Sequence, residues 1–192
     1  MKTAYIFDFD GVLVDTMAAH FKCYEKACAE AGVPLDKAQF YSQAGMSGAE
    51  QIAYFAAKAG KKVDVGPVYR RKKELYAEYI NLATLIKPNY MLLKNLKAAG
   101  VKLAIASGSS RGSMLPLIEK FGIPYDALVT AEDVNRGKPD PELFLKAAEK
   151  LGVPAGDCTV VEDSDAGVEA GRRAGMSVLR YFPAKKIIDK FF

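Results

Sequence analysis

The chain has 192 residues, of which 50% are hydrophobic and 26% are charged, and its formal net charge is +4. This composition is typical of a globular domain rather than a disordered chain, and so small a net charge does not predict nucleic-acid binding. No uncharged apolar run reaches the length of about 18 residues that a membrane-spanning helix needs. Charged residues interrupt the N-terminal apolar stretch, so no secretory signal is predicted. The three cysteines lack metal-type spacing and are expected to be buried thiols of a cytoplasmic protein.

The first part of the chain predicts one strand followed only by helices. A run of β-forming residues over 3–9 predicts a buried strand that enters a loop. Helical patterns follow over 16–31, 47–59 and 67–82, and glycines or prolines end the first two. We therefore expect an all-helical segment after the first strand.

From residue 90 onward, helical and strand patterns alternate. Such alternation predicts a parallel sheet with helices on both faces, to which the first strand also belongs. We therefore expect an α/β core formed by residues 1–15 and 86–192, interrupted by an all-helical insert over residues 16–85. The predicted helices are 90–99, 110–121, 141–151 and 164–174, and the predicted strands are 101–106, 127–130, 158–161 and 177–181.

Polar side chains follow four of the predicted strands. Because parallel strands end at a common edge, where open α/β folds bind their ligands, we expect these side chains to meet. Carboxylates about 4 Å apart repel by about 4 kcal/mol per pair at an effective dielectric of 20, so the cluster needs a cation. These loops offer oxygen ligands and no Cys or His, which favours a hard ion such as Mg²⁺. The residues are Asp8 and Asp10, then Ser107–Ser110, then Lys138, and finally Glu162 and Asp163.

The same edge also predicts a site for an oxyanion. Ser107–Ser110 opens a helix, where backbone N–H groups and the helix dipole favour a phosphate. Gly108 would let the backbone approach the ligand closely, and Lys138 would add a positive charge. With a metal ion and a carboxylate nearby, these groups indicate phosphoryl transfer. Two structural alternatives stay open: Ser107 as a helix cap and Lys138 as a surface lysine.

Taken in order along the core, these residues resemble the four motifs of the haloacid dehalogenase superfamily. The first motif is DFDGVLVDT over residues 8–16, and the second is Ser107. The third is Lys138 within GKPDP, and the fourth is EDSDAG over residues 162–167. The pattern most resembles the branch of β-phosphoglucomutases and small sugar-phosphate phosphatases. The resemblance implies a Rossmann-like core with a helical cap, formed by residues 16–85.

The resemblance also implies a role for each motif residue. Asp8 would be the nucleophile that forms an aspartyl phosphate, and Asp10 would be the general acid and base. Carbon–halogen dehalogenases of the superfamily lack this second aspartate, so its presence favours phosphoryl transfer. The implied Mg²⁺ ligands are Asp8, Asp10 through its backbone carbonyl, Asp163, and Glu162 directly or indirectly; the implied phosphate-binding residues are Ser107, Gly108 and Lys138.

Within the predicted cap, the resemblance points to further substrate-binding candidates. His20 lies where the mutases carry a histidine that helps to shuttle protons, and Lys72 is a candidate match to a mutase cap lysine. Gly45 and Ser47 belong to a stretch that matches the substrate-specificity loop of the cap. A core or surface histidine is the structural alternative for His20.

The specificity loop favours a phosphatase over a mutase. Mutases place a lysine just before the glycine of this loop and an arginine after its serine, whereas this chain has Ala44 and Gly48. Fewer cations would hold a bisphosphate intermediate less firmly, so we expect water to compete successfully for the phosphoryl group.

We therefore expect a Mg²⁺-dependent phosphohydrolase that acts on a small phosphorylated metabolite, typically a sugar phosphate. The alternative in the same class is a β-phosphoglucomutase-type enzyme. The alternative from another class is a non-catalytic phosphoacceptor or binding domain, although receiver domains lack the second aspartate and the cap. We expect no nucleic-acid or membrane partner, and a monomer or weak dimer.

Overall fold

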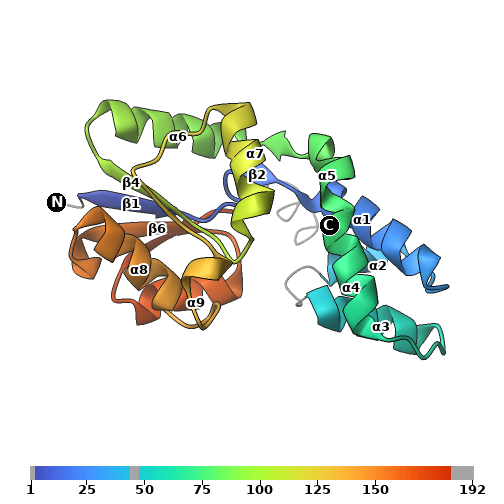
Figure 1. Ribbon diagram of the computed structural model, residues 1–192. Helices are drawn as coiled ribbons and strands as arrows, with labels where there is room; N and C mark the ends of the chain where they lie inside the picture. The colour runs from blue at the N-terminus through green and yellow to red at the C-terminus, as the bar shows by residue number, and fades with distance from the viewer. Residues whose placement is uncertain (1–2, 44–47, 183–192) are drawn as a thin grey trace, which may run out of the picture. The chain divides into compact units, whose positions relative to one another are not determined.

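The computed structural model describes residues 3–43 and 48–182 of the chain. The chain divides into two compact units, one built from residues 1–15 and 85–192 and the other from residues 16–84 (Figure 1). The first unit carries a sheet with helices, and the second consists mainly of helices. Within the described ranges, no helix has both the length and the apolar character that a membrane crossing requires.

The first unit is built on a five-stranded sheet in the order β5-β4-β1-β6-β7. Every pairing in this sheet is parallel, and Phe7 lies opposite both Ile105 and Val161. The chain moves outward from β1 through β4 to β5 and then returns to β6 and β7 on the other side. The predicted α/β class is therefore confirmed. The strands are β1 (Ala4–Phe7), β4 (Lys102–Ala106), β5 (Ala127–Val129), β6 (Cys158–Glu162) and β7 (Ser177–Arg180).

Helices cover both faces of this sheet (Figure 1). Successive side chains of a strand point to opposite faces, and the small residues Ala104 and Ala106 of β4 pack in one cluster with Phe144. The same cluster holds Ala170, so two of the helices share this face. These are α8 (Glu142–Leu151) and α9 (Asp165–Arg173), while α6 (Lys87–Ala98) and α7 (Arg111–Phe121) lie on the opposite face.

Helix α7 shows how local sequence sets the helix ends. The Ser110 side chain accepts a hydrogen bond from the backbone N–H of Ser113, which caps the helix N-terminus. The helix stops at Gly122, whose φ of 58° belongs to the left-handed region that glycine adopts readily. Ser110 is thus the cap of α7, and the interpretation of Ser107 as that cap is wrong.

The second unit packs its helices around an aromatic and aliphatic core that includes Phe21, Phe40 and Leu75. The predicted helix over 67–82 is wrong as a single element, because the structure breaks it at Leu75 into two α-helices and a 3₁₀ turn. Its first piece begins before Pro67, since the Asp64 side chain accepts the backbone N–H of Gly66. The elements are α1 (Met17–Glu30), α2 (Lys37–Ser42), α3 (Gly48–Lys58), α4 (Val65–Glu74), α5 (Tyr76–Tyr79) and η1 (Ile80–Leu82).

Several short elements were not predicted from the sequence. Helix α2 has only six residues, and the Asp36 side chain caps it by accepting the backbone N–H of Gln39 at 2.8 Å. A separate two-stranded sheet joins β2 and β3. Elements this short carry too few residues for a periodic pattern. The remaining ones are β2 (Val14–Asp15), β3 (Thr84–Leu85), η2 (Ala131–Asp133) and η3 (Ala155–Asp157).

Candidate active site

The chemistry-bearing residues gather at the carboxyl edge of the sheet. Asp8 directly follows β1, and its backbone N–H donates to the Val161 carbonyl of β6 at 3.0 Å. Ser107 directly follows β4, and its N–H donates to the Val129 carbonyl of β5 at 3.1 Å. These bonds extend the parallel pairing by one residue and fix where each side chain leaves the sheet. The loops that follow β1, β4 and β6 therefore lie at the same edge of the sheet.

Lys138 joins two carboxylates at this edge. Its Nζ lies 2.6 Å from Asp8 Oδ1 and 2.5 Å from Glu162 Oε1. The side chains of Lys138, Asp8 and Glu162 are only 14%, 8% and 1% exposed. The interpretation of Lys138 as a surface lysine is therefore wrong. Two carboxylates and one ammonium share this buried space, and Asp163 lies in the same cluster.

Burial and neighbouring charges have opposite effects on the pKa values of Asp8 and Lys138. Burial raises the pKa of Asp8 to about 7, despite the neighbouring Lys138 ammonium. Burial alone would lower the pKa of Lys138, but the charges of Asp8 and Glu162 raise it above its usual value. Lys138 therefore stays a cation, whereas the charge of Asp8 is costly unless more positive charge arrives.

Glu162 is fixed by the start of the next helix. Its Oε2 accepts the backbone N–H of Ser164 at 2.6 Å and the Ser164 hydroxyl at 3.0 Å. Both carboxylate oxygens of Glu162 therefore carry protein hydrogen bonds, one from Lys138 and one set from Ser164. A Cβ at Gly167 would lie 1.9 Å from Glu162 Oε1, so only glycine leaves room there. Ser164 and Gly167 were missed as functional residues, although they lie in the fourth motif.

The remaining acidic group, Asp163, faces the turn after β1. Gly11 has a φ of +83°, and a Cβ on it would lie 2.9 Å from Asp163 Oδ2. Asp8, Glu162 and Asp163 each offer a carboxylate oxygen within 4.8 Å of the others. A set of oxygen donors around a costly buried negative charge fits a hard divalent cation such as Mg²⁺.

Asp10 and the second motif meet beside this cluster. The Ser109 hydroxyl donates to Asp10 Oδ2 at 2.5 Å, and the Ser107 hydroxyl donates to the same oxygen at 3.2 Å. Ser107 is buried, while a Cβ at Gly108 would meet nothing within 4 Å, so the backbone there faces open space. Sequence reasoning missed the role of Ser109, which is one of three serines in a row of four residues.

The candidate cap residues come together within their own unit. Lys72 is 9% exposed, and its Nζ lies 3.2 Å from His20 Nδ1 and 4.9 Å from the centroid of the Tyr24 ring. The His20 ring stacks on Tyr76 with 5.0 Å between centroids. His20 and Lys72 thus form a partly buried pair held by aromatic rings.

Of the predicted substrate-specificity loop, only the end lies within the described residues. Ala44, Gly45 and Ser47 lie outside the described residues. At Gly48, a Cβ would lie 2.4 Å from the Tyr24 hydroxyl oxygen and 2.4 Å from a ring carbon of Tyr69. A larger residue at position 48 would therefore have to displace two tyrosines.

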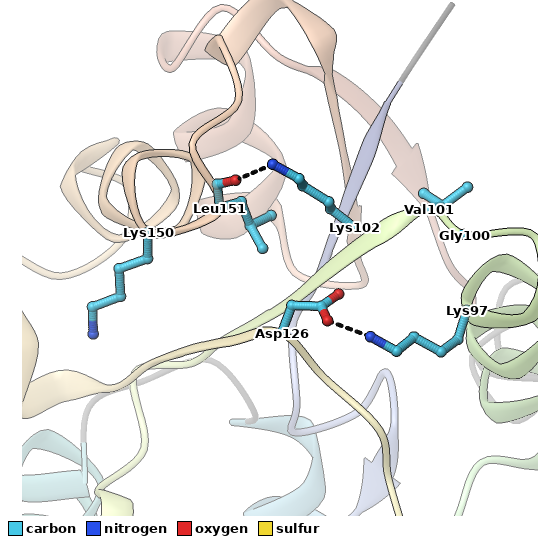
Figure 2. Close-up of a pocket in the computed structure, with 7 residues that line it drawn as sticks. All are labelled: Lys97, Gly100, Val101, Lys102, Asp126, Lys150 and Leu151. Carbon is cyan, nitrogen blue, oxygen red and sulfur yellow. Dashed lines mark hydrogen bonds and ion pairs between the residues drawn. The ribbon is translucent and has the colours of Figure 1, made fainter.

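The amino edge of the same sheet carries a pocket of about 370 Å³ (Figure 2). Lys97 pairs there with Asp126, and Lys102 Nζ donates to the Leu151 carbonyl at 2.8 Å. Figure 2 shows the Lys150 side chain directed away from both of these contacts. These interactions neutralise a carboxylate and a helix end. Lys150 Nζ lies 2.9 Å from Asp133 Oδ1, so each charged side chain that lines the pocket has a partner.

The three cysteines lie in the interior of the protein. Cys23, Cys28 and Cys158 are all buried, as predicted, and none is in a disulfide. Burial raises the pKa of both Cys23 and Cys28 to about 11. Their thiolate forms are therefore scarce at neutral pH, which disfavours thiolate chemistry at these two positions.

Comparison with known proteins agrees with this geometry. Residues 5–181 match the family described as haloacid dehalogenase-like hydrolase. β-Phosphoglucomutase of Bacillus subtilis is 31% identical over 183 residues, which cover 90% of this chain and 80% of that protein. The phosphorylated carbohydrates phosphatase of Thermotoga maritima is 30% identical over 182 residues, which cover 90% of this chain and 82% of that protein. The crystal structure of β-phosphoglucomutase from Clostridium difficile is similar with a TM-score of 0.77 and 25% identity, over 98% of this chain and 88% of that one. The chain therefore belongs to the haloacid dehalogenase-like hydrolases.

Proposed function

We propose that the protein is a Mg²⁺-dependent phosphohydrolase that acts on a small phosphorylated metabolite, most readily a sugar phosphate. The observation that carries the proposal is the 2.6 Å contact between Asp8 Oδ1 and Lys138 Nζ, beside the oxygens of Glu162 and Asp163. A buried carboxylate next to a fixed cation and further oxygen donors can attack phosphorus while its surroundings balance the charge. The names of the relatives support a phosphorylated carbohydrate as the substrate class.

In the first step, an oxygen of Asp8 would attack the phosphorus atom of the substrate. The bond between Asp8 and phosphorus forms while the ester P–O bond breaks, and its electron pair stays on the leaving oxygen. Asp10 would donate a proton to that oxygen. Lys138, the Ser107 hydroxyl and the backbone N–H groups around Gly108 would bind the oxygens of the transferring phosphoryl group.

In the second step, water would attack the aspartyl phosphate. Asp10, now a carboxylate, would remove a proton from the water as its oxygen bonds to phosphorus. The bond between phosphorus and Asp8 breaks, and its electrons return to the Asp8 carboxylate. Inorganic phosphate leaves, and Asp10 is protonated again for the next turnover.

The acidic cluster would hold the metal through Asp8, Asp163 and the backbone carbonyl of Asp10. Both oxygens of Glu162 already carry hydrogen bonds, which favours an indirect role for Glu162 through Lys138. When bound, Mg²⁺ supplies positive charge that reduces the repulsion between the phosphate and the Asp8 carboxylate.

The surroundings of Gly48 favour hydrolysis over mutase chemistry. Tyr24 and Tyr69 fill the space that an arginine at this position would enter. A second phosphate would thus lack a cation that the mutases use, and a bisphosphate intermediate would escape more readily. The phosphomutase nevertheless stays the second candidate, since β-phosphoglucomutases are among the relatives. The cytoplasmic location and the monomer or weak dimer stay predictions.

A phosphate-release screen would test the proposal. The substrates would be β-glucose 1-phosphate, glucose 6-phosphate, phosphoglycolate and nucleoside monophosphates, each with Mg²⁺ and with excess chelator. We expect Mg²⁺-dependent release from a sugar phosphate, and none from the Asp8→Asn variant. Conversion of β-glucose 1-phosphate to glucose 6-phosphate without net release would establish the mutase instead. A stable phosphorylated Asp8 without turnover would favour a phosphoacceptor domain.

A further inference from the structure

Asp10 is held by two hydroxyl groups that reach the same carboxylate oxygen. The Ser109 hydroxyl donates to Asp10 Oδ2 at 2.5 Å, whereas the Ser107 hydroxyl donates at 3.2 Å. The contact from Ser109 is shorter by 0.7 Å, so Ser109 makes the stronger of the two hydrogen bonds. Of these two partners, the one with the shorter contact, Ser109, is outside the set that the motifs identify.

The loop that carries Ser109 is itself fixed at several points. The Ser109 N–H donates to the Ser107 hydroxyl oxygen at 3.1 Å, and the Ser109 carbonyl accepts the Ala131 N–H at 3.1 Å. Two residues further on, the Arg111 N–H donates to Glu132 Oε2 at 2.9 Å. These bonds tie the loop after β4 to the loop after β5. The backbone that carries the Ser109 hydroxyl is therefore held in place by hydrogen bonds.

Ser107 and Ser109 would make different contacts once a substrate binds. In the proposed mechanism, the Ser107 hydroxyl turns to an oxygen of the phosphoryl group and can no longer hold Asp10. Asp10 must nevertheless stay directed at the leaving oxygen, because misplacement of a catalytic group by about 1 Å can lower the rate about 100-fold. A second hydroxyl on the same oxygen would keep Asp10 in place throughout the reaction.

We propose that Ser109 is the positioning residue for Asp10, and that its hydroxyl frees Ser107 to bind the phosphoryl group. The inference rests on the proposed function, since it assumes that Asp10 transfers protons. It assigns different tasks to two serines that lie two residues apart.

This role predicts a dependence on the leaving group. A sugar alkoxide is a poor leaving group and needs the proton from Asp10, whereas 4-nitrophenolate leaves without one. The value of kcat/KM reports the steps up to departure of the leaving group. Loss of the Ser109 hydroxyl should therefore lower kcat/KM for a sugar phosphate much more than for 4-nitrophenyl phosphate.

The experiment compares wild type and Ser109→Ala on 4-nitrophenyl phosphate and on the sugar phosphate that the screen finds to be hydrolysed fastest. We expect kcat/KM to fall about tenfold or more for the sugar phosphate and less than about threefold for 4-nitrophenyl phosphate. The inhibition constant of inorganic phosphate should change less than about twofold, because Ser109 does not bind the phosphoryl group in this mechanism.

Two further variants separate positioning from general damage to the loop. Ser109→Thr keeps a hydroxyl and should restore most of the selective loss. Ser113→Ala removes a hydroxyl that hydrogen-bonds with Ser110 on the exposed start of α7, and it should behave like wild type.

Equal losses on both substrates, together with weaker phosphate inhibition, would overturn the inference and make Ser109 a phosphate ligand. Unchanged kinetics for Ser109→Ala would overturn it as well. If wild type released phosphate from neither compound class with Mg²⁺ present, the proposed function itself would fail, and that result is independent of the Ser109 variants.

Discussion

The two edges of the sheet in the first unit carry similar charges in different settings. At the carboxyl edge, Lys138 lies between Asp8 and Glu162, and all three side chains are nearly excluded from solvent. At the amino edge, Lys97 pairs with Asp126, but their side chains are 39% and 37% exposed. Both edges therefore hold close ion pairs, but the cluster at the carboxyl edge is buried and has one carboxylate more than its cation can balance.

The energetic cost of an ion pair depends on its burial, so the two clusters differ in what their charges contribute. Exposed pairs contribute at most about 1 kcal/mol, because water solvates each partner almost as well. Buried charges cost several kcal/mol each, so a surplus carboxylate in a buried cluster has no structural benefit. The surplus of carboxylates at the carboxyl edge, together with the pKa of Asp8 that burial raises, therefore supports the proposed cation site there.

The largest expected effect follows from Asp8→Asn. Turnover should fall by about 1,000-fold or more, because an amide oxygen does not form the covalent intermediate. The fold should remain, which circular dichroism would check. Measured phosphate release by Asp8→Asn at the wild-type rate would contradict the assignment of the nucleophile.

The pH dependence of stability in Asp8→Asn tests whether Asp8 is as buried as the structure shows. The folded pKa of Asp8 is raised to about 7 from an ordinary value of 3.8, so the folded metal-free protein retains a proton that the unfolded chain has lost between these pH values. The free energy of unfolding contributed by this group therefore decreases as pH rises through that range. Urea unfolding in excess chelator at pH 5 and pH 8 should show this decrease for wild type and a smaller one for Asp8→Asn. An equal pH dependence in both proteins would refute the burial argument.

Removal of the buried cation should affect both activity and stability. Lys138→Met leaves Asp8 and Glu162 facing each other without a positive charge. We expect a loss of about 3–5 kcal/mol in the free energy of unfolding without metal and a fall of about 100-fold or more in kcat. The control at the amino edge is Lys97→Met, which should change stability by less than about 1 kcal/mol. Similar stability losses in both variants would remove the distinction between the edges.

A change that carries no charge tests whether Glu162 acts through Lys138. The Cβ of Gly167→Ala would lie 1.9 Å from Glu162 Oε1 and should displace that carboxylate from Lys138. We expect kcat to fall about tenfold, as when a supporting partner of a site is lost. Gly112→Ala is the matched control, because a Cβ there meets nothing within 4 Å in a helix on the same sheet. Normal kcat in Gly167→Ala would show that the position of Glu162 is unimportant.

The sequence predicts the class of the fold because the relevant signals are local and periodic. Strand and helix patterns alternate along the core, and parallel strands bring the residues that follow them to one edge. The contact of Asp8 with Lys138 spans 130 positions, yet it follows from this topological rule. Short or broken elements escape prediction, as the break at Leu75 and the six-residue helix α2 show.

The contacts that hold Asp10 and Glu162 in place cannot be predicted from sequence patterns. Ser109 reaches Asp10 across 99 positions, and nothing in the run of serines tells which hydroxyl will point there. Gly167 matters only because the Glu162 side chain folds back over it, which depends on a side-chain direction. Only the three-dimensional arrangement assigns a role to such residues.

The smallest expected effect belongs to the amino edge itself. Lys102 Nζ donates to the Leu151 carbonyl at 2.8 Å, at the last residue of α8. A cation near a helix C-terminus stabilises it by about 0.3–1 kcal/mol, so Lys102→Met should lower the free energy of unfolding by that amount. Lys102 begins β4, whereas the candidate active site lies beyond the other end of that strand. We therefore expect kcat and KM to stay within about twofold of wild type. Parallel unfolding and phosphate-release measurements on this variant would check both expectations. A marked loss of activity at full stability would mean that the amino edge takes part in function, and burial would then fail as the criterion that separates the two edges.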